Sequence, residues 1–590
     1  MSNLQIAKIL RQVAASYAIK NEAKYRFQII AYQRAADAIE GSNLEIEELF
    51  KENKLEFLPG VGPSIRAHLE DLLTKGKVKH FEWVMFGVPK SVYPLLDVPT
   101  FGPKKAYRLV KEFSLQDPKS VISDIEKLAK QGKIAKLEGF GEKSQEDILR
   151  AISEFRLGIG KTSRMVLPYA FEAAEKLVGY LKASQHVVKA VPLGSLRRMM
   201  STVGDIDIAV ATNKPKDVIS HFVSYPYKER IIEKGEATAS ILVSGGRQID
   251  LMTQAPQGFG SLLQHFTGSK NHNIHLREYA LSKGLSLSEY GIKKKTKSGK
   301  STMVQVPTEE EFYQKLNMTW IPPELREDKG EIELAISHKL PKLVEQTDIK
   351  GDLHIHSSFA IDPSHDLGKN SIEEMVSQAK KLKYEYIGLS EHNPSISKHN
   401  SGQIYSLIAR RNENIEQIKS STKNIRIFKL LEIDILSNGK LAVDHKSLSI
   451  LDGAIVSIHS SFAMSRDKMT KRVIHGLSHP KAKILAHPTG RLINQRVGYE
   501  LDFDKIFDFC KKNNKALEIN SWPTRLDLPD TLIMEAVKNN IKLVVNTDSH
   551  AVWQMDLMKY GVAMARRGWA KKNDILNTLG YNDFNEWLKM

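Results

Sequence analysis

The feature that most constrains the fold is a regular alternation that begins at residue 350. Short apolar runs, among them YEYIGLS, LDGAIVSIHS and IKLVVNTDSH, alternate there with stretches of helical spacing. When strands and helices alternate in this way, each helix returns the chain so that the next strand can pair in parallel. Residues 350–590 are therefore expected to form a parallel sheet or a βα barrel.

Histidines and carboxylates stand at the ends of these apolar runs. Of the 19 histidines in the chain, eleven lie from His354 onward. His354 and His356 are two apart in an expected strand, so their side chains share one face. The strand-end candidates that follow are Glu391-His392, Glu432 with Asp434, His459, His487 and Asp548 with His550. The carboxyl ends of barrel strands meet at one mouth, and imidazole with carboxylate suits zinc or manganese.

Other histidines in this half do not follow a strand end. They are His365, His399, His445, His475 and His479. Without that placement, an ordinary surface or core position is the better interpretation, and no metal role is predicted for them.

A second acidic set lies in residues 160–255, where short β-rich runs are separated by turns. Asp205 and Asp207 are two apart in GDIDI and so share a strand face, and Asp250 lies on a later run. Three carboxylates about 4 Å apart would repel by about 4 kcal/mol per pair at an effective dielectric of 20. Two divalent cations would remove that cost and serve an in-line displacement at phosphorus. Gly194, Ser195 and Arg198 precede them as candidate phosphate-binding residues.

Residues 1–155 are predicted to be mostly helical, with glycine hairpins between helices. The hairpins contain Gly60 and Gly62, Gly139 and Gly141, and, in a weaker copy with threonine at the first position, Gly102 followed by Lys104. One such hairpin could be a plain helix turn with a glycine cap. Three in a chain with a net charge of +17 favour backbone N–H groups that grip a DNA phosphate backbone.

Because of these motifs, residues 1–318 resemble the family X DNA polymerases. The matching motifs are GSLRR, GDID, IDL and GSLLQHFTGSKNHNIHLR. The resemblance implies a helical lyase-like subdomain (1–80), fingers with helix-hairpin-helix motifs (81–157), an α/β nucleotidyltransferase palm (158–255) and a thumb (256–318). It also implies that Asp205, Asp207 and Asp250 are catalytic and hold two Mg²⁺ or Mn²⁺ ions. The implied nucleotide-binding residues are Gly194, Ser195, Arg198, Gly204, His265, Phe266, Thr267, Gly268, Asn273 and Arg277.

Two positions depart from this family. His265 stands where the family usually has a tyrosine beside the sugar, which predicts weak discrimination against ribonucleotides. His68 stands where polymerase-beta-like relatives carry the lysine that forms a Schiff base. A histidine cannot form that imine, so no lyase activity is predicted at this position.

Residues 350–590 resemble a PHP domain and follow a predicted surface linker over residues 319–349. This resemblance implies a distorted seven-stranded βα barrel with up to three Mn²⁺ or Zn²⁺ ions. The implied ligands are His354, His356, Asp362, His392, Glu432, His459, His487, Asp548 and His550. Asp362 is a substitute, because the usual aspartate position holds Ile361; either the backbone shifts, or one metal is held more weakly. Arg491 matches a position that could hold a phosphate.

The sequence thus predicts a DNA-directed DNA polymerase for repair gap filling with a 3′–5′ exonuclease in the PHP part, and abasic-site or 3′-phosphate cleavage as further options. The expected partners are gapped or primer-template DNA and deoxynucleoside triphosphates. No apolar run approaches 18 residues, so no membrane span is predicted and a cytoplasmic location is expected. The chain is further expected to be a monomer associated with the nucleoid. The alternatives are a DNA-binding repair scaffold with an inactive PHP site and an RNA-directed nucleotidyltransferase.

Overall fold

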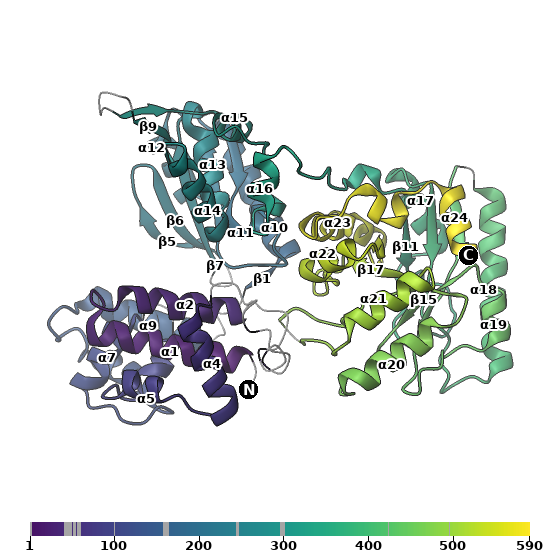
Figure 1. Cartoon of the computed structure of the whole chain (residues 1–590), viewed down its shortest axis with the longest axis horizontal. Helices are drawn as coiled ribbons and strands as arrows, with labels where there is room; N and C mark the ends of the chain where they lie inside the picture. The colour runs from purple at the N-terminus through teal and green to yellow at the C-terminus, as the bar shows by residue number, and fades with distance from the viewer. Residues whose placement is uncertain are drawn as a thin grey trace. The chain divides into compact units, whose positions relative to one another are not determined.

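The computed structural model describes residues 3–40, 46, 50, 55, 61–98, 101–156, 164–243, 247–295, 301–422, 424–494 and 496–590. The chain divides into two compact units, Met1–Ser163 and Arg164–Met590 (Figure 1). Each unit is described by itself below.

The first unit is helical, as the spacing of apolar residues predicts. Its helices are α1 (Asn3–Asn21), α2 (Arg26–Glu40), α4 (Pro63–Lys75), α5 (Lys79–Met85), α6 (Val92–Leu95), α7 (Pro103–Glu112), α8 (Val121–Lys130) and α9 (Glu142–Arg156). In α1, Ile6, Leu10 and Val13 recur at helical spacing and are fully buried. The helices enclose two apolar cores, one under α1, α2, α4 and α5 and one under α6 to α9.

The second unit begins with a five-stranded sheet in the order β2-β4-β7-β6-β5. Its strands are β2 (Lys189–Pro192), β4 (Ile206–Ala211), β5 (Lys228–Lys234), β6 (Thr238–Val243) and β7 (Arg247–Gln254), and β1 (Met165–Val166) pairs separately with β3 (Thr202–Val203). The central strands β4 and β7 are parallel, whereas the outer pairs are antiparallel. Helices α10 (Leu167–Lys182), α11 (Gly194–Arg197) and α12 (Pro215–Val223) contact this sheet. We call this region the palm.

The next elements form a small helical and β part, the thumb. They are η2 (Pro256–Gly258), α13 (Phe259–Thr267), α14 (Lys270–Ser282), β8 (Leu285–Ser288), β9 (Gly291–Lys295), β10 (Ser301–Val304) and α15 (Glu309–Lys315). The three strands form an antiparallel sheet in the order β10-β9-β8.

Residues 319–349 are not the surface linker that the sequence predicts. They contain η3 (Pro323–Leu325), α16 (Glu331–Ile336) and η4 (Gln346–Asp348), and Ile321, Leu325 and Ile332 are buried with the thumb residues. Arg326 is fully buried as well, because its Nη1 donates to Glu309 at 2.6 Å. Six of its ten large apolar side chains are buried, and the buried charge is paired. We call this packed segment the connector.

The remainder of the unit is built on parallel strands. They are β11 (Gly351–Ile355), β12 (Tyr386–Leu389), β13 (Arg426–Lys429), β14 (Glu432–Asp434), β15 (Ala454–Ser457), β16 (Ala482–Leu485), β17 (Ala516–Asn520) and β18 (Lys542–Asn546). They form two sheets, β11-β12-β13 and β14-β15-β16-β17-β18. Parallel bridges between His392 and Glu432 and between Ile355 and Ser549 join the two sheets at both edges. With β13 and β14 counted as one bent strand, these strands give the expected distorted seven-stranded barrel.

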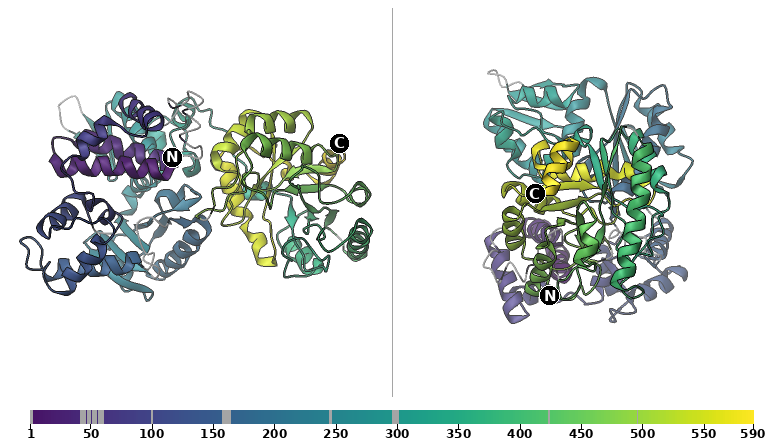
Figure 2. Two further views of the ribbon diagram at one scale, coloured as in Figure 1. Left: turned by 90° about the horizontal axis from the view of Figure 1, so that it is seen from below. Right: turned by 90° about the vertical axis from the view of Figure 1, so that its right-hand side faces the viewer.

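Helices lie outside the barrel strands (Figures 1 and 2), and α18 is the longest of them. They are α17 (Ile372–Lys381), α18 (Ser401–Ser421), α19 (His445–Ser449), α20 (Arg466–Leu477), α21 (Phe503–Lys512), α22 (Asp530–Lys538), α23 (Met558–Arg567) and α24 (Tyr581–Lys589), with η5 (Val552–Leu557), η6 (Lys572–Asp574) and η7 (Leu576–Thr578). Among the described residues of the chain, no helix combines the length and the apolar character that a membrane crossing needs.

Candidate active sites

The palm sheet brings the three predicted catalytic aspartates to one place. Asp207 on β4 is paired in register with Asp250 on the parallel strand β7, and Asp205 directly precedes β4. Residues in parallel register point to the same side of a sheet. Ser240 on β6 donates to Oδ1 of Asp250, and Gln248 Nε2 donates to both of its oxygens at 2.9 and 3.1 Å. These two neighbours fix the Asp250 carboxylate.

The charges of the palm carboxylates interact strongly. Burial, Asp250 and Asp205 together raise the pKa of Asp207 to about 7, although Arg198 opposes the shift. The carboxylate is therefore costly to ionise without a cation, which fits the expected divalent ions. In the described part of the chain, all groups of three or more ligand atoms within 4.8 Å of one another lie in the barrel. The carboxylate oxygens of the three palm aspartates are thus spaced more widely than the ligand atoms of the barrel groups.

Gly194 lies against this site. Its φ of +56° is a left-handed conformation, and a Cβ atom added there would lie 2.7 Å from Oδ2 of Asp207. A larger residue would collide with the Asp207 carboxylate and strain the backbone, so local geometry favours the glycine of the GS motif. Ser195 follows it on α11, and Gly204 lies just before Asp205.

The other predicted nucleotide-binding residues lie on α13, at the α13–α14 junction and on α14. Nε of Arg198 donates to Glu327 at 2.9 Å, and its Nη1 donates to the carbonyl of Thr267 at 2.5 Å. Asn273 Nδ2 donates to the carbonyl of His265 at 2.7 Å. Arg277 Nη2 lies 3.2 Å from Nδ1 of the same histidine. The structure therefore joins His265, Asn273 and Arg277 into one cluster, while Phe266 packs against the palm core and Gly268 lies beside Arg198.

The DNA-binding glycines are placed at helix starts where they are described. Gly62 is the N-cap of α4 and Gly102 the N-cap of α7, and neither helix has a side-chain cap. Gly141 immediately precedes α9, and Gly139 has a φ of +77°. Gly60 lies outside the described residues. Exposed backbone N–H groups at such helix starts attract anions, and DNA contact there stays a prediction.

Two further predicted positions in the first unit can be located. Lys104 forms an exposed ion pair with Glu22 at 2.8 Å. His68 lies 2.8 Å from the hydroxyl of Tyr32 and stacks on His80 with ring centroids 4.7 Å apart. Burial and the neighbouring His80 lower the pKa of His68. The lack of Schiff-base chemistry at His68 stays a prediction.

In the barrel, Glu432 at the start of β14 is the centre of a buried histidine cluster. Its Oε2 lies 2.9 Å from Nδ1 of His392, 3.1 Å from Nε2 of His354 and 3.5 Å from Nε2 of His356. Its Oε1 lies 3.0 Å from Nε2 of His487 and 3.5 Å from Nε2 of His459. One carboxylate thus faces five imidazoles that come from four other strand ends.

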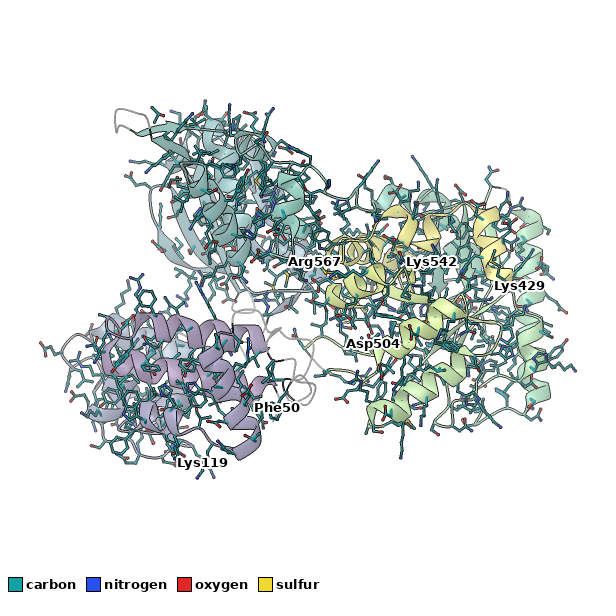
Figure 3. The ribbon with its side chains drawn as sticks, in the orientation of Figure 1. Phe50, Lys119, Lys429, Asp504, Lys542 and Arg567 are labelled. Carbon is teal, nitrogen blue, oxygen red and sulfur yellow. The ribbon has the colours of Figure 1, made fainter. Side chains whose placement is uncertain are left out.

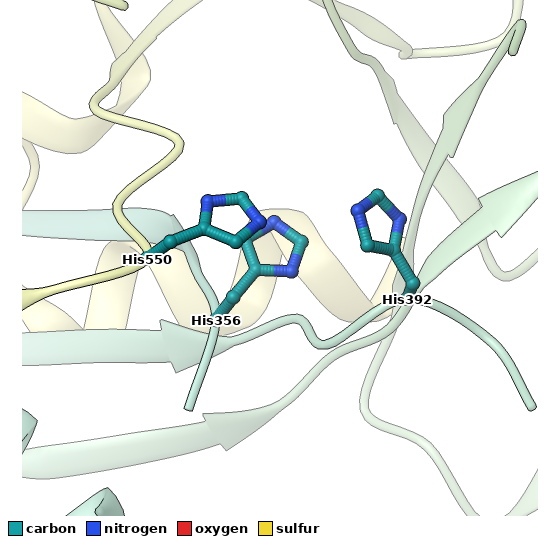
Figure 4. Close-up of side chains that lie close together, drawn as sticks. All are labelled: His356, His392 and His550. Atoms are coloured by element: carbon teal, nitrogen blue, oxygen red, sulfur yellow. The ribbon is translucent and has the colours of Figure 1, made fainter. Parts of the chain in front are cut away.

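Asp548 and His550, after β18, complete this cluster. Oδ1 of Asp548 lies 3.2 Å from Nε2 of His356 and 3.4 Å from Nε2 of His354. The rings of His356 and His550 stack with centroids 4.0 Å apart, and His392 faces them (Figure 4). Oε1 of Glu518 on β17 accepts from Nδ1 of His354 at 2.7 Å, which orients that imidazole from behind.

Two members of the cluster, His356 and Glu432, are held in the charge states that bind a metal. Burial alone would lower the pKa of His392, but Glu432 and Asp366 raise it to about 10, so His392 must lose a proton to bind a metal. Burial and the neighbours His550 and His392 lower the pKa of His356 well below its usual value, so its imidazole is neutral. Burial alone would raise the pKa of Glu432, but the imidazoles of His392, His354 and His459 lower it well below its usual range. Neutral imidazole and ionised carboxylate are the forms that bind a metal.

Several buried atoms in this cluster have no hydrogen-bond partner. They are Nε2 of His354, both ring nitrogens of His356, Oε2 of Glu432, Nδ1 of His487 and Nε2 of His550. Leaving buried polar atoms unpaired is costly, and so many in one place indicate a bound ion. Four overlapping groups could each hold a metal: His356, His392 and His550; His354, His356, Glu432 and Asp548; His392, Glu432 and His459; and His365, Asp434 and His459. The residues present therefore fit a cluster of divalent cations.

The structure corrects three interpretations of the sequence, which concern Asp362, His365 and Arg491. Asp362 does not join the cluster: its Oδ2 lies 2.7 Å from His399 and its Oδ1 3.3 Å from Lys398. Its place is taken by Asp366, which lies 3.4 Å from Nε2 of both His392 and His550. The chain after His356 makes a longer excursion than the family pattern, so a later aspartate reaches the site.

The sequence predicts no metal role for His365, but this histidine lies at the edge of the barrel histidine cluster. Its Nε2 is 3.1 Å from Oδ1 of Asp434, which also lies 2.8 Å from Nδ1 of His459. The SHD tripeptide at 364–366 was the available signal, because it places an imidazole and a carboxylate side by side. Arg491 is not directed at a phosphate, since it donates to the carbonyls of Arg525 and Leu526.

Comparisons with known proteins agree with this arrangement. Three family models match: a helix-hairpin-helix domain over residues 1–78, a DNA polymerase beta thumb over 262–327 and a PHP domain over 352–522. The chain is 34% identical over 592 residues to the DNA polymerase/3'-5' exonuclease PolX of Bacillus subtilis (strain 168), and the match covers 100% of both chains.

Partial matches divide along the same lines. DNA polymerase lambda of Rattus norvegicus is 22% identical over 355 residues, which are 55% of this chain and 56% of that protein. A probable phosphatase of Caldicellulosiruptor saccharolyticus is 26% identical over 156 residues, which are 26% of this chain and 59% of that protein. The full-length match decides the family: the chain belongs to the bacterial PolX proteins, family X DNA polymerases with helix-hairpin-helix and polymerase-beta-like parts and a C-terminal PHP domain.

Proposed function

We propose that this chain extends DNA at the palm and removes 3′-terminal nucleotides at the barrel, as a repair polymerase that fills short gaps. The observation that carries the proposal is the presence of two separate acidic sites, each with its own ligands, in a chain similar over its full length to a DNA polymerase/3'-5' exonuclease. Gapped or primer-template DNA and deoxynucleoside triphosphates are the proposed substrates.

In the palm, Asp205, Asp207 and Asp250 would hold two Mg²⁺ or Mn²⁺ ions. Bound there, the ions would stabilise the attacking and leaving oxygens of nucleotidyl transfer. Ser240 and Gln248 keep Asp250 in place for this role. Gly194, Ser195 and Arg198 would receive the triphosphate, since a helix start and a guanidinium both bind phosphate oxygens.

The sugar and base of the incoming nucleotide would lie along α13 and α14. Gly204, His265, Phe266, Thr267 and Gly268 are the proposed neighbours of the sugar and triphosphate. Asn273 and Arg277 would face the minor-groove side of the new base pair. The shared contacts of His265 with Asn273 and Arg277 support one continuous surface for these contacts.

In the barrel, His354, His356, His392, Glu432, His459, His487, Asp548 and His550, with Asp366 in place of Asp362, would hold up to three Mn²⁺ or Zn²⁺ ions. Bound there, such ions would activate water for attack on a phosphodiester. Nε of Arg525 lies 3.6 Å from Oδ2 of Asp548, which makes this guanidinium a candidate to bind the phosphate that is cleaved.

An inactive PHP site fits the structure less well. The sequence left this alternative open because Ile361 replaces a usual ligand, but Asp366 supplies a carboxylate to His392 and His550.

The glycines at helix starts, Gly62, Gly102 and Gly141, together with Gly60, Gly139 and Lys104, would grip the DNA backbone. We also propose that the chain acts as a monomer in the cytoplasm, at the nucleoid, where such a DNA substrate would lie.

One experiment tests both activities in the same tube. Gapped DNA with a 5′-labelled primer is incubated with Mn²⁺, with and without deoxynucleotides, and the primer length is followed. Asp207→Asn should abolish lengthening and retain shortening, while His356→Ala should do the reverse. His399→Ala is the matched control, because this histidine contacts Asp362 outside the cluster. Loss of both activities in a folded single variant would contradict two independent sites.

A further inference from the structure

A chain of partly buried charges connects the palm to the barrel. It consists of Arg198 after α11, Glu327 in the connector, Arg567 at the end of α23 and Asp530 at the start of α22. The side chains of Arg198, Glu327 and Arg567 are only 13%, 17% and 2% exposed. Figure 3 labels Arg567 at its place on α23.

Glu327 is shared by the two arginines. Its Oε1 accepts from Nε of Arg198 at 2.9 Å and from Nη1 of Arg567 at 3.0 Å. Burial alone would raise the pKa of Glu327, but Arg567 and Arg198 lower it below its usual value, so the carboxylate stays charged. Arg567 also donates from Nη1 to the backbone carbonyl of Arg198 at 2.7 Å. It therefore holds both the partner and the backbone of Arg198.

These contacts fix the direction of the Arg198 guanidinium. Nε is directed to Glu327 and Nη1 to the carbonyl of Thr267. No hydrogen bond among the described residues uses Nη2, and the charge of Arg198 acts on Asp207. The contacts of Nε and Nη1 thus hold the guanidinium in one orientation and leave Nη2 for a ligand.

From this geometry we propose that Arg567 of the barrel is a positioning residue for nucleotide binding in the palm, acting through Glu327 and Arg198. The inference rests on the proposed role of Arg198 in binding the triphosphate. Asp530 completes the arrangement, since its Oδ2 accepts from Nη2 of Arg567 at 2.7 Å and so anchors the arginine to the barrel. The fold of the exonuclease part thereby contributes to the affinity of the polymerase part for its nucleotide.

Arg567→Ala should raise the KM for deoxynucleotides roughly 10- to 100-fold, the range of one hydrogen bond to a charged group, with a much smaller change in kcat. A binding group that loses its orientation weakens the nucleotide complex while the catalytic aspartates stay in place. Exonuclease rate and thermal midpoint, measured on the same full-length preparation, report whether the barrel is intact. Arg567→Lys, which keeps the charge but cannot reach all three acceptors, should give an intermediate KM.

Arg566→Ala is the matched control. This neighbour on α23 also pairs with the connector, because its Nε donates to Glu324 at 2.7 Å and its Nη1 to the carbonyl of Val344 at 3.1 Å. It touches neither Glu327 nor Arg198 in the described contacts. The control therefore removes an ion pair between the same two regions and should leave the KM for nucleotides within about twofold. An equal rise in both variants would overturn the proposal in favour of general loosening.

The double variant Arg198→Ala/Arg567→Ala separates the possible failures. If Arg567 acts through Arg198, its removal should add less than about twofold once Arg198 is gone. An unchanged KM in Arg198→Ala alone would refute the nucleotide role of Arg198. A raised KM in Arg198→Ala with none in Arg567→Ala would overturn the present inference alone. If Arg567→Ala loses exonuclease activity as well, Glu327→Gln, which keeps the side-chain shape, replaces it, and an unchanged KM there overturns the proposal.

Discussion

The palm and the barrel arrange the carboxylates and imidazoles that we propose as cation ligands in opposite ways. In the palm, Asp205 is exposed, Asp207 and Asp250 are partly buried, and their oxygens are not gathered within 4.8 Å of one another. In the barrel, His354, His356 and Glu432 are fully or almost fully buried, and their ligand atoms already converge. An all-carboxylate site that awaits substrate phosphates suits exchangeable Mg²⁺, whereas a preformed cage of imidazoles suits a resident metal.

The largest effect should come from the centre of the barrel. Glu432→Gln removes the one charge that faces five imidazoles. We expect exonuclease activity to fall at least roughly 1,000-fold and bound metal to be lost, because the remaining ligands then carry too little negative charge. Primer extension should stay within about twofold. Degradation of labelled single-stranded DNA and metal content after dialysis measure the two effects, and a metal-loaded, active variant would show that the cluster is not the catalytic centre.

A smaller effect should separate two neighbouring aspartates. Asp366→Ala should lower exonuclease activity about 10- to 100-fold, since its carboxylate faces His392 and His550 at the edge of the cluster. Asp362→Ala should change it by less than about twofold, because that side chain contacts Lys398 and His399 and none of the cluster histidines in the described contacts. The two variants are compared at limiting and saturating Mn²⁺. The opposite order would restore Asp362 as the ligand.

The contrast between these two aspartates shows how far the sequence could lead. Strand-end histidines predicted the barrel mouth, because parallel strands must deliver their carboxyl ends to one place. The spacing in GDID likewise placed Asp205 and Asp207 together. The predictions about metal ligands were wrong where they depended on the path of a loop. Asp366 and His365 come from the loop after β11, and no periodicity in the sequence encodes the course of that loop.

The connector was misjudged for a different reason. Its composition is that of a surface segment, but Arg326 is buried and Glu327 partly buried, because partners distant in sequence, Glu309 and Arg567, neutralise them. A buried charge can be recognised only when its partner is known, and the partner of Glu327 lies 240 residues away. Strands and motifs can therefore be predicted from local sequence, whereas ion pairs between distant residues can be recognised only once the fold is known.

The pH dependence of metal binding should also distinguish the two sites. Burial and its acidic neighbours raise the pKa of Asp207 to about 7, so below that pH a metal must displace a proton. Mn²⁺ affinity of the palm should fall up to tenfold per pH unit below about 7 and level off above it. Burial alone would lower the pKa of His392, but Glu432 and Asp366 raise it to about 10, so the affinity of the barrel should keep rising well above pH 7.

Two variants isolate the sites for this titration. Calorimetric titration of Glu432→Gln with Mn²⁺ reports the palm, and that of Asp207→Asn reports the barrel. Parallel pH profiles for the two would mean that the difference in proton linkage between carboxylate and imidazole ligands does not govern metal binding here.

The smallest effect concerns the choice of sugar at His265. Burial lowers the pKa of His265 further than Glu289 raises it, so the imidazole is neutral. Arg277 donates from Nη2 toward Nδ1 at 3.2 Å, which leaves the proton of the ring on Nε2. A neutral ring with a free N–H can donate to a ribose 2′-hydroxyl, worth about 0.5–1.5 kcal/mol, or up to roughly tenfold in rate. We therefore expect weak discrimination against ribonucleotides, strengthened several-fold in His265→Tyr.

The opposing explanation is that the backbone carbonyl of His265 excludes the hydroxyl whatever the side chain. That carbonyl already accepts from Nδ2 of Asn273 at 2.7 Å, and Gln264 holds Asn273 from the other side at 2.8 Å. Its position is thus fixed by α14, and tyrosine in place of histidine would not move it. Incorporation of matched ribo- and deoxynucleotides by the two proteins decides between the explanations. Equally high selectivity in both would assign discrimination to the carbonyl, while a rise confined to His265→Tyr would assign it to the ring.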